Sequence, residues 1–185
     1  MTKQELRAVF KKRRSGLDRV EIAEKSGKII RRLTDTAFYQ ESGTVMAYCS
    51  AFGEVDTMGL LACLWADGKS VYVPVCDMEK REAYPVRIKG MADLRPGAYG
   101  ILEPKNCLPE APDKLDMILV PGIAFDRRGG RIGFGMGYYD KLLRNTRAWK
   151  AALAYNFQII DDVFSQPHDV PMDCIITESE LIVCE

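Results

Sequence analysis

The chain has 185 residues, which is enough for one domain with a substantial core, so we expect a single domain over residues 1–185. Lysine and arginine together number 26, as do aspartate and glutamate, and this balance argues against binding to nucleic acid or to an anionic membrane. No apolar run approaches the length that spans a bilayer, and the polar start does not resemble a signal peptide, so we expect a cytoplasmic protein.

Two helices are predicted at the start of the chain. Residues 2–13 carry an apolar stripe, and Thr2 and Glu5 fit a capping box at their beginning. Asp18 and Glu21 predict the start of the second helix. Its apolar face comprises Ile22, Ile29, Ile30 and Leu33.

Strands and helices alternate over the rest of the chain. Strands are expected at 44–50, 69–76, 82–89, 115–122, 150–156, 173–177 and 181–185, and helices at 58–66, capped by Asp56 or Thr57, and at 138–146. The strand at 115–122 is almost wholly apolar, which is typical of a strand buried on both faces. The alternation favours an α/β fold, a three-layer α/β/α sandwich around a largely parallel mixed sheet.

Cysteine and histidine contents argue against a metal centre built from these residues. No two cysteines fall at the close spacing of a zinc or redox pair, and His168 is the only histidine. We expect all six cysteines to be buried thiols that act as small hydrophobic residues: Cys49, Cys63, Cys76, Cys107, Cys174 and Cys184.

The stretch "GGRIGFGMGYYDK", residues 129–141, follows the buried strand and precedes a helix. Ligands of open α/β sheets bind beyond the carboxyl ends of strands, and closely spaced glycines let backbone N–H groups converge on a phosphate. Arg131 and Lys141 would add positive charge. The stretch matches neither the dinucleotide fingerprint, because Tyr138 occupies a glycine position, nor a Walker loop, because Met136 stands where lysine is needed. A flexible hairpin-like turn explains the glycines equally well.

Two aspartates are candidates for a magnesium site. Asp140 lies in the first turn of the predicted helix, where an acid either favours the helix dipole or, beside a phosphate loop, holds magnesium. Asp173 opens the strand at 173–177 and would share that site if it reached the same end of the sheet.

Several motifs together resemble one enzyme family. "VPGIAFDRRGGRIGFGMGYYDKLL" is similar to the signature of the 5-formyltetrahydrofolate cyclo-ligase family, also called methenyltetrahydrofolate synthetases. "KQELR", "YCSAFGEVDT", "PGAYGILEP" and "PHDVPMDCIIT" resemble further segments of that family in the same order, over nearly the whole chain.

The resemblance implies an enzyme that converts 5-formyltetrahydrofolate to 5,10-methenyltetrahydrofolate, with MgATP as co-substrate and ADP and phosphate as products. The formyl oxygen would attack the γ-phosphate, and the folate's 10-nitrogen would then close the ring as phosphate leaves. The protein's task is mainly alignment and charge neutralisation. We expect the enzyme to act as a monomer.

The resemblance also implies roles for individual positions. Lys3 and Arg7, four residues apart on one helix face, match ATP-phosphate ligands, and with Arg131 and Tyr139 they form the expected catalytic set. The ATP-binding residues would be Lys3, Gln4, Glu5, Leu6, Arg7, Arg131, Ile132, Gly133, Phe134, Gly135, Met136, Gly137, Tyr138, Tyr139 and Asp140. The folate-binding residues would be Cys49, Glu54, Tyr84 and Tyr139, and the magnesium ligands Asp140 and Asp173.

Plainer interpretations remain for the same residues. Lys3 and Arg7 are otherwise ordinary solvated charges, Glu54 a loop carboxylate before a helix, and the two tyrosines core packing. The chain departs from the family at residues 98–100, where a bulky residue is common, and over 82–89, where Tyr84 is the one aromatic candidate. A non-catalytic nucleotide- or folate-binding module is the alternative function, followed by a sugar-phosphate isomerase or acyl-transfer enzyme of related architecture.

Overall fold

A seven-stranded mixed sheet forms the centre of the computed structural model, which describes residues 2–80, 82–97 and 100–184. The strand order is β12-β11-β9-β6-β1-β2-β3, with the five inner strands parallel and the two edge strands antiparallel to their neighbours. The strands are β1 (Thr44–Met46), β2 (Ser70–Asp77), β3 (Glu82–Ile88), β6 (Met117–Val120), β9 (Trp149–Leu153), β11 (Cys174–Ile176) and β12 (Leu181–Val183).

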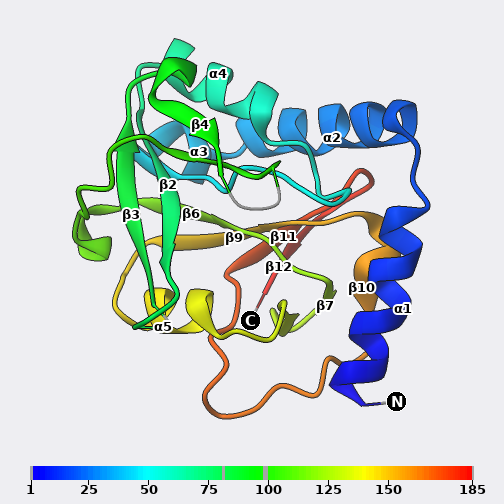
Figure 1. The fold of residues 1–185 in the computed structure, drawn as a ribbon. Helices are drawn as coiled ribbons and strands as arrows, with labels where there is room; N and C mark the ends of the chain where they lie inside the picture. The colour runs from blue at the N-terminus through cyan, green and yellow to red at the C-terminus, as the bar shows by residue number, and fades with distance from the viewer. Residues whose placement is uncertain (1, 81, 98–99, 185) are drawn as a thin grey trace.

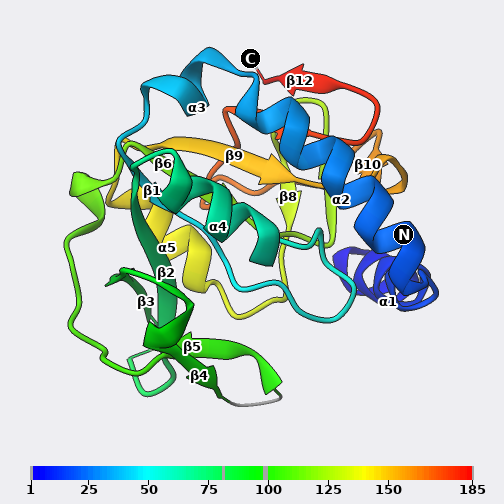
Figure 2. The same ribbon diagram turned by 90° about the horizontal axis from the view of Figure 1, so that it is seen from above.

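Helices cover both faces of this sheet, as Figures 1 and 2 show. On one face lie α2 (Arg19–Thr34), α3 (Ala37–Glu41) and α4 (Met58–Ala66), and on the other lies α5 (Tyr138–Arg144). Each face has its own apolar core, because alternate strand residues point to opposite sides: Val45 packs toward α2 and α4, whereas Met46 packs toward α5. The three-layer α/β/α sandwich is therefore confirmed.

The first helix, α1 (Lys3–Ser15), packs on a small second sheet instead of on the central one. That sheet has the order β10-β7-β8, with β7 (Ala124–Asp126), β8 (Arg131–Ile132) and β10 (Ile159–Ile160). Leu6 and Phe10 of α1 are buried against Ala124 and Ile132. This packing sets α1 beside the glycine-rich segment, which continues from β8 (labelled in Figure 2), and Arg7 of α1 bonds to the carbonyl of Gly133.

Local signals placed the helix starts correctly. Both predicted capping boxes are present, Thr2 with Glu5 and Asp18 with Glu21. At α4 the N-cap is Thr57, but its side chain makes no capping bond, and the carboxylate of Asp56 accepts the Met58 N–H instead.

Several element boundaries were predicted wrongly. The strand expected at 44–50 ends at Met46, because the chain then turns toward α4 and the Tyr48 carbonyl accepts the hydroxyl of Thr57. The elements not predicted are short: α3, β7, β8, β10 and the hairpin of β4 (Leu94–Pro96) with β5 (Leu102–Pro104). Residues 98–99, part of a predicted departure from the family, and residue 185, the end of the last predicted strand, lie outside the described residues.

The expectation of six buried thiols is also wrong. Cys174 is buried, Cys49 and Cys184 are half-buried, and three are exposed: Cys63, Cys76 and Cys107. Cys63 lies on α4, whose outer side faces solvent, so an apolar sequence context did not predict burial there. Within the part of the chain that is described, no helix is long and apolar enough to cross a membrane.

Candidate functional site

A buried arginine and a buried glutamate face each other beyond the carboxyl ends of β1 and β6. Arg14, at the end of α1, is 3% exposed, and its Nη1 lies 3.8 Å from Oε1 of Glu54. The same guanidinium donates to the carbonyl oxygens of Phe52 at 3.0 Å and Gly122 at 3.3 Å. Arg14 therefore ties α1 to two loops at the edge of the sheet where α/β folds bind ligands.

The turn that carries Glu54 is built closely around Arg14. Gly53 adopts a φ of +73°, and a Cβ there would lie 2.9 Å from the Arg14 carbonyl oxygen, so glycine is required. The Glu54 carboxylate accepts the Ala51 N–H at 3.0 Å. Burial raises the pKa of Glu54, against the opposing effects of Arg14 and of this hydrogen bond.

Three buried polar atoms of the glycine-rich segment and α5 have no hydrogen-bond partner in the described part of the chain. They are Nε of Arg131 and the hydroxyls of Tyr138 and Tyr139. The rest of the Arg131 guanidinium is held, with Nη1 3.2 Å from the Pro121 carbonyl and Nη2 3.1 Å from Oδ1 of Asp140. Buried polar groups are normally satisfied, so these three unpartnered atoms are candidates for contact with a ligand.

Tyr139 lies close to Glu54 and Cys49. Burial raises the pKa of its hydroxyl well above the usual value, and the charges of Glu54, Cys76 and Cys49 act in the same direction. Burial also raises the pKa of the Cys49 thiol to about 11, so this cysteine is a neutral contact and not a nucleophile at neutral pH. Three of the four predicted folate-binding residues are thus brought together.

Tyr84, the fourth, shares one neighbour with that group, because Cys76 raises the pKa of both the Tyr84 and the Tyr139 hydroxyl. It is half-buried on β3, opposite Val75 of β2. Burial raises the pKa of its hydroxyl, with smaller contributions from neighbouring thiol and charged groups. Its folate contact stays a prediction.

The cations of α1 meet the glycine-rich segment. Nε of Arg7 donates to the Gly133 carbonyl at 2.9 Å. Beyond it, Gly135 has a φ of +100° and Gly137 a φ of +72°, conformations that other residues rarely adopt. Nζ of Lys3 lies 2.6 Å from Oδ2 of Asp169. Gly129 and Gly130 form the turn of the β7–β8 hairpin, so the turn interpretation holds for these two glycines, whereas phosphate binding by the later glycines stays a prediction.

The remaining predicted ATP residues have diverse surroundings. Glu5 is exposed and caps α1, and Leu6 and Ile132 are core residues. Gln4 is exposed, as are Phe134 and Met136. Their predicted contacts with ATP stay predictions, and the core residues would act through the backbone.

The two predicted magnesium ligands, Asp140 and Asp173, form ion pairs with different basic side chains. Asp140 pairs with Arg131, whereas Oδ2 of Asp173 accepts the backbone N–H of Lys150 at 2.7 Å and its Nζ at 2.9 Å. Cys174 of β11 pairs with Ala151 of β9, and Ala151 pairs with Leu119 of β6. Asp173, one residue before Cys174, therefore lies level with Ile118, within the length of β6. Asp173 does not extend beyond the carboxyl ends of the strands, because it precedes its own strand.

Sequence reasoning missed Arg14 and Asp169. Arg14 belongs to the run "KKRRS", in which nothing local distinguishes a buried cation from its solvated neighbours. Asp169 lies in the same "PHDVPMD" segment as Asp173. The presence of two aspartates in that segment was the one sequence signal that could have pointed to Asp169.

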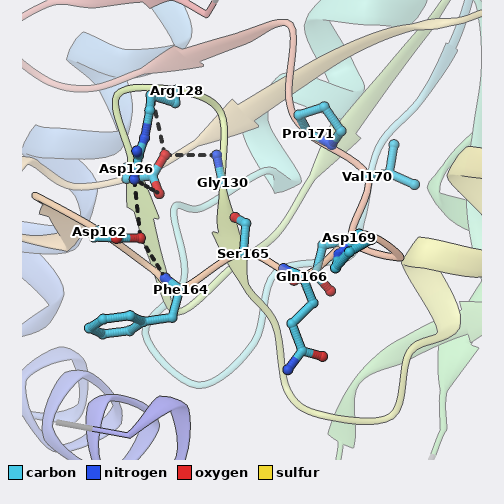
Figure 3. Close-up of a pocket in the computed structure, with 11 residues that line it drawn as sticks. Asp126, Arg128, Gly130, Asp162, Phe164, Ser165, Gln166, Asp169, Val170 and Pro171 are labelled. Carbon is cyan, nitrogen blue, oxygen red and sulfur yellow. Dashed lines mark hydrogen bonds and ion pairs between the residues drawn. The ribbon is translucent and has the colours of Figure 1, made fainter.

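A cavity of about 660 Å³ lies beside the β7–β8 hairpin, and Asp126, Asp162 and Asp169 are among the residues that line it (Figure 3). Its charged groups satisfy one another. Asp126 accepts the N–H groups of Arg128, Gly130 and Val163, and Arg128 pairs with Asp162. This cavity gives no argument for a ligand, since its acids are already neutralised.

Comparison with known proteins identifies relatives over most of the chain. The sequence profile of the 5-formyltetrahydrofolate cyclo-ligase family matches residues 1–178. The 5-formyltetrahydrofolate cyclo-ligase of Haemophilus influenzae is 28% identical, with 92% of this chain and 94% of the relative covered. That of Saccharomyces cerevisiae is 31% identical, with 95% and 94% covered.

Solved structures agree with the sequence comparisons. The structure of Aquifex aeolicus 5,10-methenyltetrahydrofolate synthetase superposes with a TM-score of 0.88 at 35% identity, covering 99% of this chain and 93% of that one. A 5,10-methenyltetrahydrofolate synthetase from Mycoplasma pneumoniae has the same fold, with a TM-score of 0.78 at 23% identity, covering 96% and 99%.

Proposed function

Because the chain belongs to the 5-formyltetrahydrofolate cyclo-ligase family, whose members are enzymes of the ligase class, we propose that it cyclises 5-formyltetrahydrofolate to 5,10-methenyltetrahydrofolate at the expense of ATP. The observation that carries this proposal is the set of three unpartnered polar atoms on Arg131, Tyr138 and Tyr139. They lie on the segment that joins the cations of α1 to the turn of Glu54.

The phosphate end of the site is formed by α1 and the glycine-rich segment. Arg7 already contacts the backbone at Gly133, so a triphosphate wrapped by that backbone meets a guanidinium. Lys3 reaches the same side of α1, one turn earlier, and exchanges Asp169 for a phosphate oxygen. Nε of Arg131, free and buried, is a further donor to developing negative charge.

The folate end is formed by Glu54 and Tyr139. The buried carboxylate accepts hydrogen bonds from ring N–H groups of the pterin, while the unpartnered Tyr139 hydroxyl bonds to a ring or formyl oxygen. Since Arg14 anchors the turn of Glu54, the acceptor is positioned before substrate arrives.

The reaction proceeds in two displacements. The formyl oxygen attacks the γ-phosphorus and ADP leaves, which gives an imidate phosphate. The 10-nitrogen then attacks the formyl carbon, the new C–N bond forms, and the C–O bond breaks to release phosphate; the proton of the 10-nitrogen is lost to solvent. A formyl oxygen leaves poorly as oxide but well as phosphate, and the protein mainly aligns oxygen and phosphorus.

Magnesium fits Asp140 better than Asp173. Magnesium bound with nucleotide takes one or two carboxylates, with water and phosphate oxygens completing its shell. Asp140 is partly exposed and pairs with Arg131, whose Nε is unpartnered, so it is the proposed ligand. Asp169 would become a second carboxylate when Lys3 turns to a phosphate, with the Gln166 N–H still donating to its Oδ2. Lys150 already donates to Oδ2 of Asp173 through both its backbone N–H and its Nζ. The ion would neutralise phosphate charge and orient the γ-phosphate.

Near-ultraviolet absorbance tests the proposed function. Methenyltetrahydrofolate absorbs at longer wavelength than its precursor, so purified protein with 5-formyltetrahydrofolate, ATP and magnesium should produce a rise that disappears when any one component is omitted. A flat trace from folded protein that still binds ATP would contradict catalysis and favour a non-catalytic binding module.

A further inference from the structure

The turn that carries Glu54 has a strained backbone. Phe52 and Gly53, the two residues before Glu54, have φ angles of +51° and +73°. Residues with a side chain rarely adopt such angles, and a strained turn persists only where its surroundings hold it in place. Among the hydrogen bonds of the described residues, one reaches the Glu54 carbonyl oxygen, from the Tyr155 hydroxyl at 2.9 Å. The far end of this turn is therefore tied to Tyr155.

Tyr155 is a rigid point from which to hold the turn. It lies two residues beyond the carboxyl end of β9, and its side chain is fully buried in the core on the face of α2 and α4. Its ring stacks on that of Phe157, with centroids 5.6 Å apart. A ring packed on all sides keeps one rotamer, so its hydroxyl has a defined position.

Gln158 fixes the backbone of Tyr155 and also reaches the neighbourhood of Arg14. Its side chain is 2% exposed. Oε1 accepts the Tyr155 N–H at 2.9 Å, and Nε2 donates to the carbonyl oxygen of Gly122 at 3.0 Å and to the next carbonyl along the chain at 3.0 Å. The Gly122 carbonyl is also an acceptor for Nη1 of Arg14. One buried amide therefore links Tyr155 to the loop that holds the guanidinium.

These contacts close into a ring around the buried ion pair. From Glu54 the ring passes through Tyr155, Gln158 and Gly122 to Arg14, and it returns to Glu54 across the 3.8 Å ion pair. Both members of the pair are thus held by one short segment between β9 and β10. A carboxylate held in this way loses little conformational freedom when a ligand binds, which strengthens binding.

We propose that Tyr155 and Gln158 are positioning residues for folate binding, which hold Glu54 and Arg14 at the separation in which the Glu54 carboxylate accepts the pterin. The inference rests on the proposed function and deepens its folate end. Tyr155 and Gln158 act through Glu54 without touching the substrate. Loosening the ring of contacts therefore weakens folate binding and leaves nucleotide binding and the chemical step nearly unchanged.

Tyr155→Phe tests the inference with the least disturbance, because it removes one hydroxyl and keeps the packing of the aromatic ring. Tyr39→Phe is the matched control. Tyr39 is 1% exposed, its hydroxyl lies 2.6 Å from Oδ2 of Asp67, and both residues precede strands, at the opposite end of the sheet from Glu54. Gln158→Met is the second variant, which removes the amide at similar side-chain length.

Five quantities are measured for each variant: the free energy of unfolding, kcat, the Michaelis constants for 5-formyltetrahydrofolate and for ATP, and the dissociation constant of 5-formyltetrahydrofolate by calorimetry without ATP. We expect Tyr155→Phe to raise both folate constants about 3- to 10-fold, the effect of one lost hydrogen bond. Its kcat and its Michaelis constant for ATP should change by less than about twofold. Gln158→Met should raise the folate constants at least as much, whereas Tyr39→Phe should lower stability alone.

A purely structural role would lower stability and leave the folate constants of Tyr155→Phe equal to those of Tyr39→Phe. That result would overturn the inference, as would a fall in kcat with unchanged folate constants. A double-variant cycle adds Tyr155→Phe to Glu54→Gln. If Tyr155 acts through Glu54, the folate dissociation constant should rise by less than about twofold further, and a fully additive rise would also overturn the inference.

The same measurements separate this inference from the proposed function. Wild type that binds 5-formyltetrahydrofolate but shows no turnover with ATP and magnesium would refute the proposed function, and the folate dissociation constants of the variants would still decide the inference. Wild type that does not bind 5-formyltetrahydrofolate would refute both.

Discussion

Replacing Arg14 by methionine should lower the free energy of unfolding by about 3 kcal/mol at neutral pH. The variant keeps the apolar stem but leaves Glu54 buried without its cation and two loop carbonyls, those of Phe52 and Gly122, without a donor. Breaking a buried ion pair costs about 3 to 5 kcal/mol, and the 3.8 Å separation from Glu54 favours the lower end.

The deficit should depend on pH in a defined direction. Burial raises the pKa of Glu54 and Arg14 opposes that rise, so losing Arg14 raises the pKa further. The buried carboxylate becomes neutral as the pH falls through this raised pKa. The difference in the free energy of unfolding between the variant and wild type then becomes smaller. The deficit is therefore full at neutral pH and shrinks on acidification.

Urea unfolding at neutral and mildly acidic pH measures both effects. Arg13→Met is the matched control, because Arg13 is exposed and its guanidinium lies 4.6 Å from the Phe157 ring centroid, a contact worth about 0.5 to 1 kcal/mol. Combining Arg14→Met with Glu54→Gln should recover part of the loss. The reasoning is refuted if the two arginine variants lose the same stability, or if the Arg14 deficit is constant with pH.

Further expectations concern the site itself. Asp140→Asn should slow turnover strongly and raise the magnesium requirement, and a normal magnesium titration would exclude the role of this carboxylate. Glu54→Gln should raise the Michaelis constant for folate mainly, whereas in wild type that constant should rise as the pH falls through the raised pKa of Glu54; an unchanged folate affinity would remove the assignment. Gly135→Ala should cost about 1 kcal/mol and weaken ATP binding because of its φ of +100°, while Gly59→Ala within α4 should not destabilise; equal effects would speak against a conformational requirement. Tyr139→Phe should leave stability nearly unchanged but lower turnover, since the hydroxyl has no partner in the described structure. A large loss of stability would show that the hydroxyl has a hydrogen-bond partner within the protein.

The sequence predicted best those features that local chemistry decides. The capping boxes of Thr2 with Glu5 and Asp18 with Glu21 each need only a four-residue pattern, so both helix starts were correct. The central strands were predicted in number and order along the chain because continuous apolar runs mark strands buried on both faces, while their ends depend on neighbours.

Features set by distant contacts were missed. The two-residue strand β8 exists because Arg131 and Ile132 pair with β7 and Ile132 packs against α1, and no pattern within the glycines indicates that. Arg14 is buried because the turn at Gly53 and the loop at Gly122 both close on it. The position of Asp173, level with Ile118 of β6, was not predicted because spacing along the sequence does not give strand register.

The most direct test of the account follows the formyl oxygen. We would supply 5-formyltetrahydrofolate labelled with heavy oxygen in the formyl group, together with ATP and magnesium, and analyse the released phosphate by mass spectrometry. If the formyl oxygen attacks the γ-phosphate, each phosphate released with methenyltetrahydrofolate carries one labelled oxygen. Unlabelled phosphate, with the label recovered in water, would contradict phosphorylation of the formyl group as the step that this site performs.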